Sequence, residues 1–216
     1  PNRVTRLYVA IADVAHFVTQ GSPLDAEARS RGTSVYLPDL VVPMLPEKLS
    51  NDLCSLRPDE ERLALCCAMD IDAAGRVIAY GIDRAVIRSR ERMIYEDVEM
   101  LLTEADARLA TRYDQLVPSF LAMRDLAKTL FARRMSQGTI DFEIPEARVV
   151  LDEHGATKDI VRVKRLMSHR LIEEFMLAAN VTVARHLAGY GVPAVYRIHP
   201  EPSQEKIETF HDTLRV

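Results

Sequence analysis

The side chains best suited to binding lie along one unusual segment, residues 31–58. Its four prolines are Pro38, Pro43, Pro46 and Pro58. Each proline removes a backbone donor and fixes φ, so an ordinary core strand or helix would exclude them. The polar and aromatic residues along the segment are Arg31, Tyr36, Asp39, Glu47, Asn51 and Asp52. This combination favours the wall of a binding site over a generic piece of core.

Tyr36 is the aromatic residue of this segment with the clearest chemical use. Its ring can stack on a flat base, and its phenol can donate a hydrogen bond. The alternative is a tyrosine that only packs, because half-buried tyrosines are common in globular proteins. The residue types alone leave both interpretations open.

A second polar group is expected on the longest predicted helix, residues 165–188. His169, Glu173 and Asn180 are spaced i, i+4 and i+11, which places them along one stripe. The apolar residues point almost all round, so we expect this helix to be buried on most sides. A polar stripe there requires hydrogen-bond partners or a wet cleft. The alternative for Glu173 is a buried carboxylate tied to an arginine, whereas Glu174 points about 100° away and is expected to be structural.

Composition limits the class of protein. The 216 residues are 48% apolar, enough for one substantial core. A net charge of −4 argues against nucleic-acid binding by overall basicity, although local basic clusters such as residues 84–92, 133–134 and 162–165 could still attract it. No apolar run approaches the roughly 20 residues that span a bilayer, so no membrane partner is expected. The cysteines at 54, 66 and 67 favour small buried thiols in a reducing, cytoplasmic compartment.

The predicted elements alternate between antiparallel strands and helices. Branched and aromatic residues predict a buried strand over residues 6–14. Two hairpins are expected, each turning at a glycine. Their strands are residues 63–70 with 76–89, and 148–152 with 159–163. The sequence therefore favours an α+β fold with a mostly antiparallel sheet and packed helices.

Helices and a further strand complete this prediction. Helical spacing of apolar residues predicts helices over residues 95–110 and 113–135 in addition to 165–188. The long helix is expected to end at Gly189 and Gly191. A strand is expected over residues 193–199, followed by a helix that Ser203 caps and that begins at Gln204. No linker divides the sequence, so we expect one domain over residues 1–216.

Several blocks of the sequence, in order, resemble the ribonuclease II/ribonuclease R (RNB) family of exoribonucleases. Besides the segment 31–58, the similar blocks are IADVAHFV (11–18), GSPLDAEARSRGTSVYLP (21–38), VIRSRERMIYEDV (86–98), IDFEIPEA (140–147), HRLIEEFMLAAN (169–180) and YRIHPEPSQEKI (196–207). The RGTSVY and IDFE blocks are most similar to the ribonuclease R type. The resemblance covers essentially the whole of this sequence.

The resemblance implies a particular activity for the parent enzyme. Members of the family hydrolyse single-stranded RNA from the 3′ end, processively, to nucleoside 5′-monophosphates with Mg²⁺. Residues 1–216 resemble the N-terminal part of the family's catalytic domain, without its upstream aspartate motif or its downstream arginine block. OB-type RNA-binding domains are expected elsewhere in the parent enzyme. We therefore expect no catalytic residue and no certain metal ligand within this portion, which alone should be inactive.

The resemblance also assigns roles to particular residues. Tyr36 matches the aromatic residue that stacks on the 3′-terminal nucleotide, and Phe142 matches the one that stacks at the other end of the enclosed bases. Tyr95 and Glu173 match the pair near the ribose. A phenol and a carboxylate can together bond a 2′-hydroxyl, the group that distinguishes RNA from DNA. Asp13 could help to place a magnesium water, although a satisfied structural acid is the alternative.

A protein of another class remains compatible with the same sequence. A non-catalytic RNA-binding or scaffold protein could be built on this fold if the natural protein lacked the aspartate motif. A general metabolic enzyme would require a nucleotide-binding loop or a nucleophile motif, and neither is present in the sequence.

Overall fold

The computed structural model describes residues 4–103, 106–141, 146–196, 198 and 200–214. The chain divides into two compact units, Pro1–Val183 and Ala184–Val216, and each is described by itself. The long helix α6, Met167–Gly189, begins in the first unit and ends in the second. All the candidate site residues discussed below belong to the first unit.

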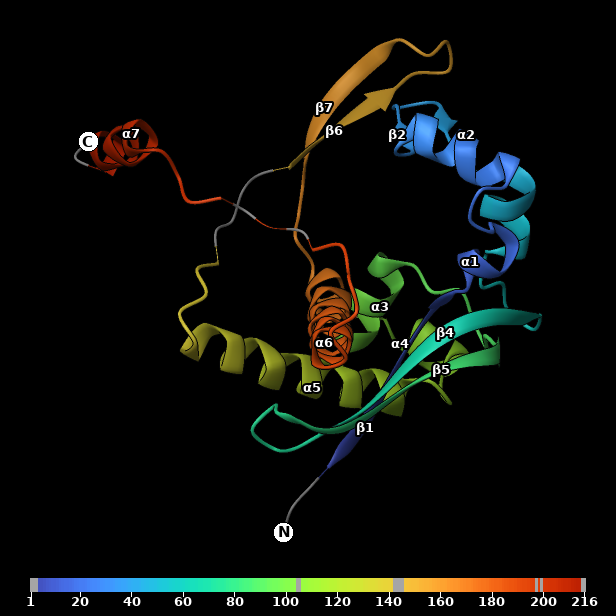
Figure 1. Cartoon of the computed structure of the whole chain (residues 1–216), viewed down its shortest axis with the longest axis vertical. Helices are drawn as coiled ribbons and strands as arrows, with labels where there is room; N and C mark the ends of the chain where they lie inside the picture. Colours follow the sequence, from blue (N-terminus) through green and yellow to red (C-terminus); the bar gives the residue numbers. More distant parts are fainter. Residues whose placement is uncertain (1–3, 104–105, 142–145, 197, 199, 215–216) are drawn as a thin grey trace. The chain divides into compact units, whose positions relative to one another are not determined.

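The first unit is built on a three-stranded antiparallel sheet (Figure 1). Its strands are β1 (Thr5–Ala12), β4 (Glu61–Ile71) and β5 (Val77–Arg88), in the order β1-β4-β5. The turn between β4 and β5 is fixed by Asp72, whose Oδ1 accepts hydrogen bonds from the amides of Ala74 and Arg76, both at 2.9 Å. Gly75 has φ +73°, which glycine adopts without strain. The predicted first strand and first hairpin are confirmed, but the predicted burial of the strand is wrong. Within β1 only Leu7 is buried, and Tyr8 and Ile11 are 62% and 61% exposed.

The proline-rich segment is an irregular path made of short pieces. After α1 (Val14–Phe17), the helix α2 (Pro23–Arg31) is capped by Ser22, whose Oγ accepts from the Asp25 amide at 3.2 Å. A two-stranded hairpin of β2 (Val35–Tyr36) and β3 (Val41–Val42) follows, and then a π-helical turn, Lys48–Leu53. Between α2 and Pro58, no regular element is longer than the six-residue turn Lys48–Leu53, as the prolines predict.

Helices cover one face of the sheet. They are α3 (Tyr95–Leu102), α5 (Val117–Ser136) and the first part of α6. The core side chains come from β1, β4 and these three helices: Leu7, Cys67, Met69, Ile71, Val98, Leu102, Leu126, Ala127, Leu130, Leu171, Phe175 and Ala179. The predicted α+β class, a mostly antiparallel sheet with packed helices, is confirmed.

The predicted helix 95–110 is wrong as a single helix. It ends at Leu102, and a separate helix α4 (Ala107–Arg112) begins after Asp106. The Asp106 carboxylate accepts from the amides of Arg108 and Leu109, which caps a new helix start. The next helix also begins later than predicted, at Val117, because Pro118 suits a first helical turn.

The prediction that α6 is buried on most sides is also wrong. Its buried residues fall on one face: Ser168, Leu171, Glu174, Phe175, Ala179 and Thr182. Ile172, Met176 and Val181 are 38%, 54% and 44% exposed. The sheet and α5 can cover only one side of a helix, so apolar residues outside that side remain exposed in this chain.

The second hairpin is confirmed, and the last predicted strand is not. Strands β6 (Glu146–Leu151) and β7 (Thr157–Val163) pair antiparallel, with Gly155 at φ +77° in the turn. No strand is present in the described part of 193–199, where Pro193 lacks an amide donor and no described strand lies alongside. The final helix α7 (Gln204–Leu214) follows Ser203 as predicted, with its Oγ 3.4 Å from the Lys206 amide. Among the described residues, no helix is long and apolar enough to cross a membrane.

Candidate functional site

Tyr36 stands at the end of β2 with its side chain 77% exposed. The backbone around it is held by side chains: Arg31 Nη1 donates to the Pro43 carbonyl at 2.9 Å, and Ser34 Oγ accepts from the Met44 amide at 2.9 Å. The ring is therefore presented on a braced loop and is not packed as a core tyrosine within this chain. Such an arrangement leaves an aromatic face open for stacking.

Tyr95 is the first residue of α3, and its ring packs on the ring of His169 in α6. The ring centroids lie 4.3 Å apart with a tilt of 43°. His169 Nδ1 accepts a hydrogen bond from the Leu166 amide at 3.1 Å, at the start of α6. In a neutral imidazole this leaves the proton on Nε2. His169 is thus fixed by a backbone bond on one nitrogen and by Tyr95 on its face.

Two adjacent glutamates of α6 have different environments. Glu174 is only 4% exposed and accepts from Arg134 of α5, with Nη2–Oε1 at 2.5 Å and Nε–Oε1 at 3.2 Å. Glu173 has a side chain 41% exposed and accepts from Arg165 Nη2 at 2.6 Å. The structural role expected for Glu174 fits its geometry. Glu173 is tied to an arginine but is not buried, so part of its carboxylate faces solvent.

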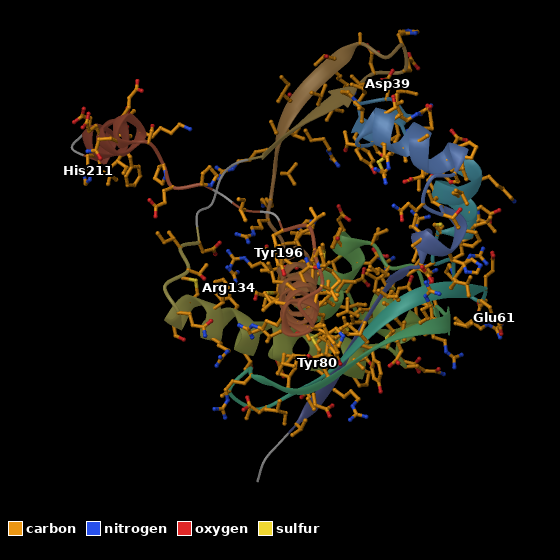
Figure 2. All side chains as sticks on the ribbon, in the orientation of Figure 1. Asp39, Glu61, Tyr80, Arg134, Tyr196 and His211 are labelled. Atoms are coloured by element: carbon orange, nitrogen blue, oxygen red, sulfur yellow. The ribbon has the colours of Figure 1, made fainter. Side chains whose placement is uncertain are left out.

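Asp141 joins two arginines that lie at the start of α6. Arg165 Nη1 donates to Asp141 Oδ1 at 2.6 Å, and Arg170 Nη2 lies 3.1 Å from Asp141 Oδ2. The hydrogen bond from Arg165 holds the pKa of Asp141 below its usual value. Arg134, labelled in Figure 2, completes this group near the end of α5 and lies 3.8 Å from Glu173 Oε1. We call these residues the α6 charge cluster: Arg134, Asp141, Arg165, Arg170, Glu173 and Glu174.

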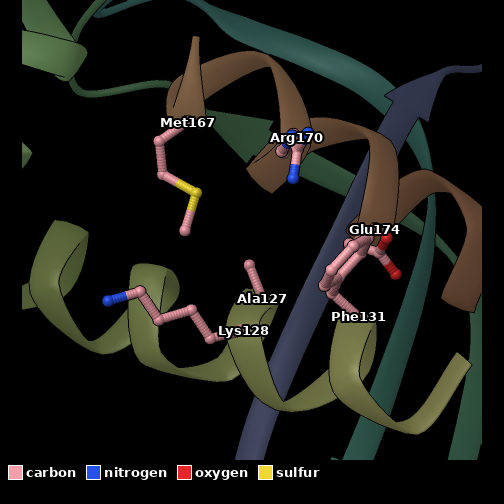
Figure 3. Close-up of a pocket in the computed structure, with 6 residues that line it drawn as sticks. All are labelled: Ala127, Lys128, Phe131, Met167, Arg170 and Glu174. Carbon is pink, nitrogen blue, oxygen red and sulfur yellow. The ribbon is translucent and has the colours of Figure 1, made fainter. Parts of the chain in front are cut away.

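A small pocket lies between α5 and α6 beside this cluster (Figure 3). Met167 and Ala127 point toward one another across it. It is lined by Ala127, Lys128, Phe131, Met167, Arg170 and Glu174 and holds about 40 Å³. The guanidinium carbons of Arg134 and Arg170 lie 5.5 and 5.4 Å from the centroid of the Phe131 ring, within cation–π range. A pocket of this size holds a few water molecules and is too small for a nucleotide.

Asp13 follows β1 directly and is 8% exposed. Its amide donates to the Leu63 carbonyl at 3.0 Å, and its Oδ2 lies 3.4 Å from Arg84 Nε. Burial, and then the negative charge of Asp13, raise the pKa of the Cys54 thiol. This environment matches a satisfied structural acid. In the part of the chain that the structure describes, no group of three or more His, Cys, Asp or Glu side chains could hold a metal ion.

The structure brings together some of the predicted site residues and not others. Tyr95 and Glu173 both lie beside His169. The ring of Tyr95 contacts the ring of His169, and Glu173 follows His169 by one turn of α6. Tyr36 belongs to the separate β2–β3 hairpin. Phe142 lies outside the described residues.

Sequence reasoning missed the α6 charge cluster as a unit. It placed arginines 134 and 165 in two basic clusters and gave them no acidic partners. The partners are 24 residues apart for Arg165 and Asp141, and 40 residues apart for Arg134 and Glu174. The acids in IDFE and HRLIEE were the available signal, but spacing alone does not pair charges over such separations.

Comparison with known proteins decides the family. The RNB domain matches residues 1–215. This chain belongs to the RNB family. "Ribonuclease R 1" of Lactococcus lactis is 45% identical over 95% of the chain, and "Ribonuclease R" of Aquifex aeolicus is 42% identical over 99%. The chain spans 25% and 30% of the length of these two relatives.

Two solved structures are similar to this chain in fold. RNase R of Mycoplasma genitalium, in complex with ribose-methylated single-stranded RNA, matches with a TM-score of 0.89 and 35% identity. That match covers 99% of this chain and 34% of the other. Yeast Ssd1, described as a pseudonuclease, matches with a TM-score of 0.75 at 21% identity over 98% of this chain and 25% of its own, which shows the fold alone.

Proposed function

We propose that this chain is part of a Mg²⁺-dependent 3′→5′ exoribonuclease of the ribonuclease R type. The enzyme degrades single-stranded RNA processively to nucleoside 5′-monophosphates. The observation that carries the proposal is the grouping of Tyr95, His169 and Glu173 at the start of α6, in a chain 45% identical to a ribonuclease R. These residues offer a phenol, an imidazole and a half-exposed carboxylate, groups suited to a ribose.

In this proposal Tyr95 and Glu173 recognise the 2′-hydroxyl of the substrate. A hydroxyl both donates and accepts hydrogen bonds. The carboxylate of Glu173 can accept from the 2′-hydroxyl, and the phenol of Tyr95 can donate to its oxygen. Tyr36 stacks on the 3′-terminal base, and Phe142 stacks at the other end of the bound run of bases. Face contacts of this kind are worth about 1–3 kcal/mol per base and do not depend on sequence. The exposure of Tyr36 supports its part in this scheme.

The proposed requirement for Mg²⁺ rests on the resemblance to the family. The described residues do not form a suitable set of Mg²⁺ ligands. Asp13 is buried beside Arg84, and the described part of the chain holds no cluster of metal donors. Mg²⁺ prefers several hard oxygen ligands in octahedral geometry. We therefore assign Mg²⁺ binding to other parts of the parent protein.

The parent enzyme is further proposed to carry OB-type RNA-binding domains and to act in the cytoplasm. The fraction of each relative that the chain spans supports a larger protein. Cys54, Cys66 and Cys67 are free thiols, which supports a reducing compartment.

A non-catalytic RNA-binding or scaffold protein is the second candidate. Its support is the lack of a metal-donor group among the described residues. The two candidates differ in one measurable property, the release of mononucleotides by the full-length protein.

The experiment uses the full-length protein with matched RNA and DNA oligonucleotides labelled at the 5′ end. We expect Mg²⁺-dependent shortening of RNA from the 3′ end and release of 5′-monophosphates, with little action on DNA. Binding of RNA without any release would favour the scaffold candidate instead. A variant with Tyr95→Ala and Glu173→Ala should retain much of its rate on RNA but lose preference for RNA over DNA, because a site built for a hydroxyl penalises its absence. Unchanged discrimination would remove the ribose role.

A further inference from the structure

Arg165 is placed to control the carboxylate of Glu173. It lies just before α6, and each end of its guanidinium contacts a different acid: Nη1 bonds Asp141 Oδ1 and Nη2 bonds Glu173 Oε2, both at 2.6 Å. The planar guanidinium presents donors in a fixed fork, so these two contacts define its position. These hydrogen bonds raise the pKa of Arg165, with Glu173 as the larger cause and Asp141 next.

Asp141 is itself anchored from the other side. Arg170, one turn into α6, lies 3.1 Å from the second oxygen of Asp141. The chain of contacts therefore runs from Arg170 through Asp141 and Arg165 to Glu173. Because Arg165 is held by Asp141, it cannot follow Glu173 as that side chain changes rotamer. Arg165 instead fixes the rotamer of Glu173.

The contact with Arg165 uses only part of the carboxylate of Glu173. An ionised carboxylate has two oxygens and about four acceptor sites. Arg165 occupies Oε2, while Oε1 has Arg134 at the longer distance of 3.8 Å. The side chain remains 41% exposed, so an acceptor is left open toward solvent. The arrangement orients the carboxylate and keeps an oxygen available.

We propose that Arg165 is a positioning residue for substrate selection, which holds Glu173 in the orientation that accepts a hydrogen bond from the ribose 2′-hydroxyl. This inference rests on the proposed function, since Glu173 must be the residue that reads the ribose. Without Arg165, a glutamate on a half-exposed helix face samples several rotamers and must be ordered by each substrate. The free-energy cost of ordering Glu173 weakens the binding of RNA, whose 2′-hydroxyl bonds the carboxylate. It does not affect DNA, which has no 2′-hydroxyl.

Arg170 provides a matched control. It also contacts Asp141 and lies on the same helix, but no contact between Arg170 and Glu173 appears among the ion pairs and hydrogen bonds of the described residues. Replacing Arg170 removes one of the two arginines on Asp141 and leaves the hydrogen bonds of Arg165 to Asp141 and to Glu173 in place. Comparing Arg165→Gln with Arg170→Gln therefore separates the orientation of Glu173 from general loss of charge in the cluster.

The test measures kcat/KM on matched RNA and DNA oligonucleotides with the full-length enzyme. In Arg165→Gln we expect the RNA-to-DNA ratio to fall about three- to tenfold, the effect of ordering one flexible side chain on binding. Arg170→Gln should keep the ratio of the wild type. Combining Arg165→Gln with Glu173→Ala should give no further fall beyond Glu173→Ala alone, because the two residues act through one contact.

Three results bear on the proposal in different ways. A wild-type ratio in Arg165→Gln, or an equal fall in both arginine variants, overturns the positioning role while the ribose role of Glu173 stands. An unchanged ratio in Glu173→Ala overturns the ribose role, and the positioning role with it. If Arg165→Gln does not fold, Arg165→Lys replaces it. A lysine keeps the charge but cannot bridge both acids, so the same fall is expected, and a wild-type ratio there overturns the proposal.

Discussion

At the scale of single residues, burial separates the two adjacent glutamates of α6. Glu174 is 4% exposed and satisfies Arg134, whereas the side chain of Glu173 is 41% exposed. Removing one partner of a buried pair leaves the other charge without compensation, which is costly. A partly exposed pair contributes little to stability. The neighbouring carboxylates should therefore differ in what they support, stability for one and substrate selection for the other.

This difference gives a prediction with opposite outcomes for two alanine substitutions. Glu174→Ala should lower the free energy of unfolding by about 2 kcal/mol, the loss of hydrogen bonds between charged groups whose arginine is 26% exposed, with little change in the RNA-to-DNA ratio of the folded enzyme. Glu173→Ala should lower it by less than about 1 kcal/mol and should reduce that ratio. Urea denaturation and matched oligonucleotide assays measure the two properties. Equal destabilisation by both substitutions would show that exposure does not separate their roles.

Tyr36 gives a prediction about product length. Tyr36→Ala removes the exposed ring that is proposed to stack on the 3′-terminal base, so short products should dissociate earlier. The limit product should lengthen more than the initial rate falls, because the substitution removes a binding contact and leaves the reacting groups alone. Gel analysis of a 5′-labelled RNA measures both. A limit product of wild-type length would contradict the stacking role.

Residue types could be predicted as candidates, but their partners could not. The spacing of His169 and Glu173 placed both on one face of α6, and the contact of Tyr95 with His169 agrees with their grouping. The link between Arg165 and Asp141 joins segments 24 residues apart, and no periodic pattern marks such a pair. Charge pairing over that distance depends on how the helices and loops pack, which residue spacing does not encode.

At the scale of elements, the two hairpins use the same turn in different surroundings. Asp72 and Asp152 each accept amide bonds within the turn, and Gly75 and Gly155 have φ of +73° and +77°. A Cβ added at Gly75 would lie 3.3 Å from the Thr129 carbonyl of α5, whereas one at Gly155 would meet nothing within 4 Å. The first turn is therefore packed on the helical layer, and the second is open.

Alanine at the two glycines should separate backbone strain from packing. Both substitutions place a side chain at positive φ, which costs about 1–2 kcal/mol. Gly75→Ala must in addition displace α5 or the turn, so its unfolding free energy should fall by about 1 kcal/mol more than that of Gly155→Ala. Urea denaturation of both variants provides the comparison. Equal losses would mean that the turn of β4–β5 moves away from α5 at no cost.

Elements were predictable where the local signal was strong. A glycine within a short polar segment marked both hairpin turns, and branched residues marked β1. The helix 95–110 failed because its apolar pattern continued across a break that Asp106 sets by capping α4. The prediction of a strand over residues 193–199 failed for a different reason. The backbone groups of a strand need a neighbouring strand as hydrogen-bond partner, and none is found there among the described residues.

At the scale of the whole molecule, this chain alone should have no exonuclease activity. The described residues contain no metal-donor group, and hydrolysis by the proposed mechanism depends on Mg²⁺. A purified preparation of residues 1–216, incubated with single-stranded RNA and Mg²⁺, should release no nucleoside 5′-monophosphates. The full-length protein serves as the positive control. Release by the chain alone would contradict this prediction, because no group of metal donors is found among the described residues.

The chain alone should also self-associate, because apolar side chains are exposed on three separate elements. Met176 of α6, Leu40 beside β3 and Phe210 of α7 are each 54% exposed. The buried face of α6 follows the helical period, and its exposed apolar residues lie outside that face. Apolar residues therefore occur all round the helix although only one face is buried, and for this reason the prediction of burial on most sides was wrong. On α6, the exposed residues Ile172 and Met176 lie one helical turn apart, and apolar side chains exposed side by side favour association between molecules.

Sedimentation velocity measures this association for the purified chain at several concentrations. We expect species larger than 24.4 kDa that grow with concentration. Met176→Glu should reduce the association without lowering the temperature of the thermal transition, because the side chain of Met176 contributes little to the hydrophobic core. Leu171→Ala, at 2% exposure, is the contrasting change: it should lower stability by about 2–5 kcal/mol and leave the exposed face intact. A monodisperse monomer with an ordinary thermal transition would contradict the expectation and would show that these apolar side chains are tolerated in water.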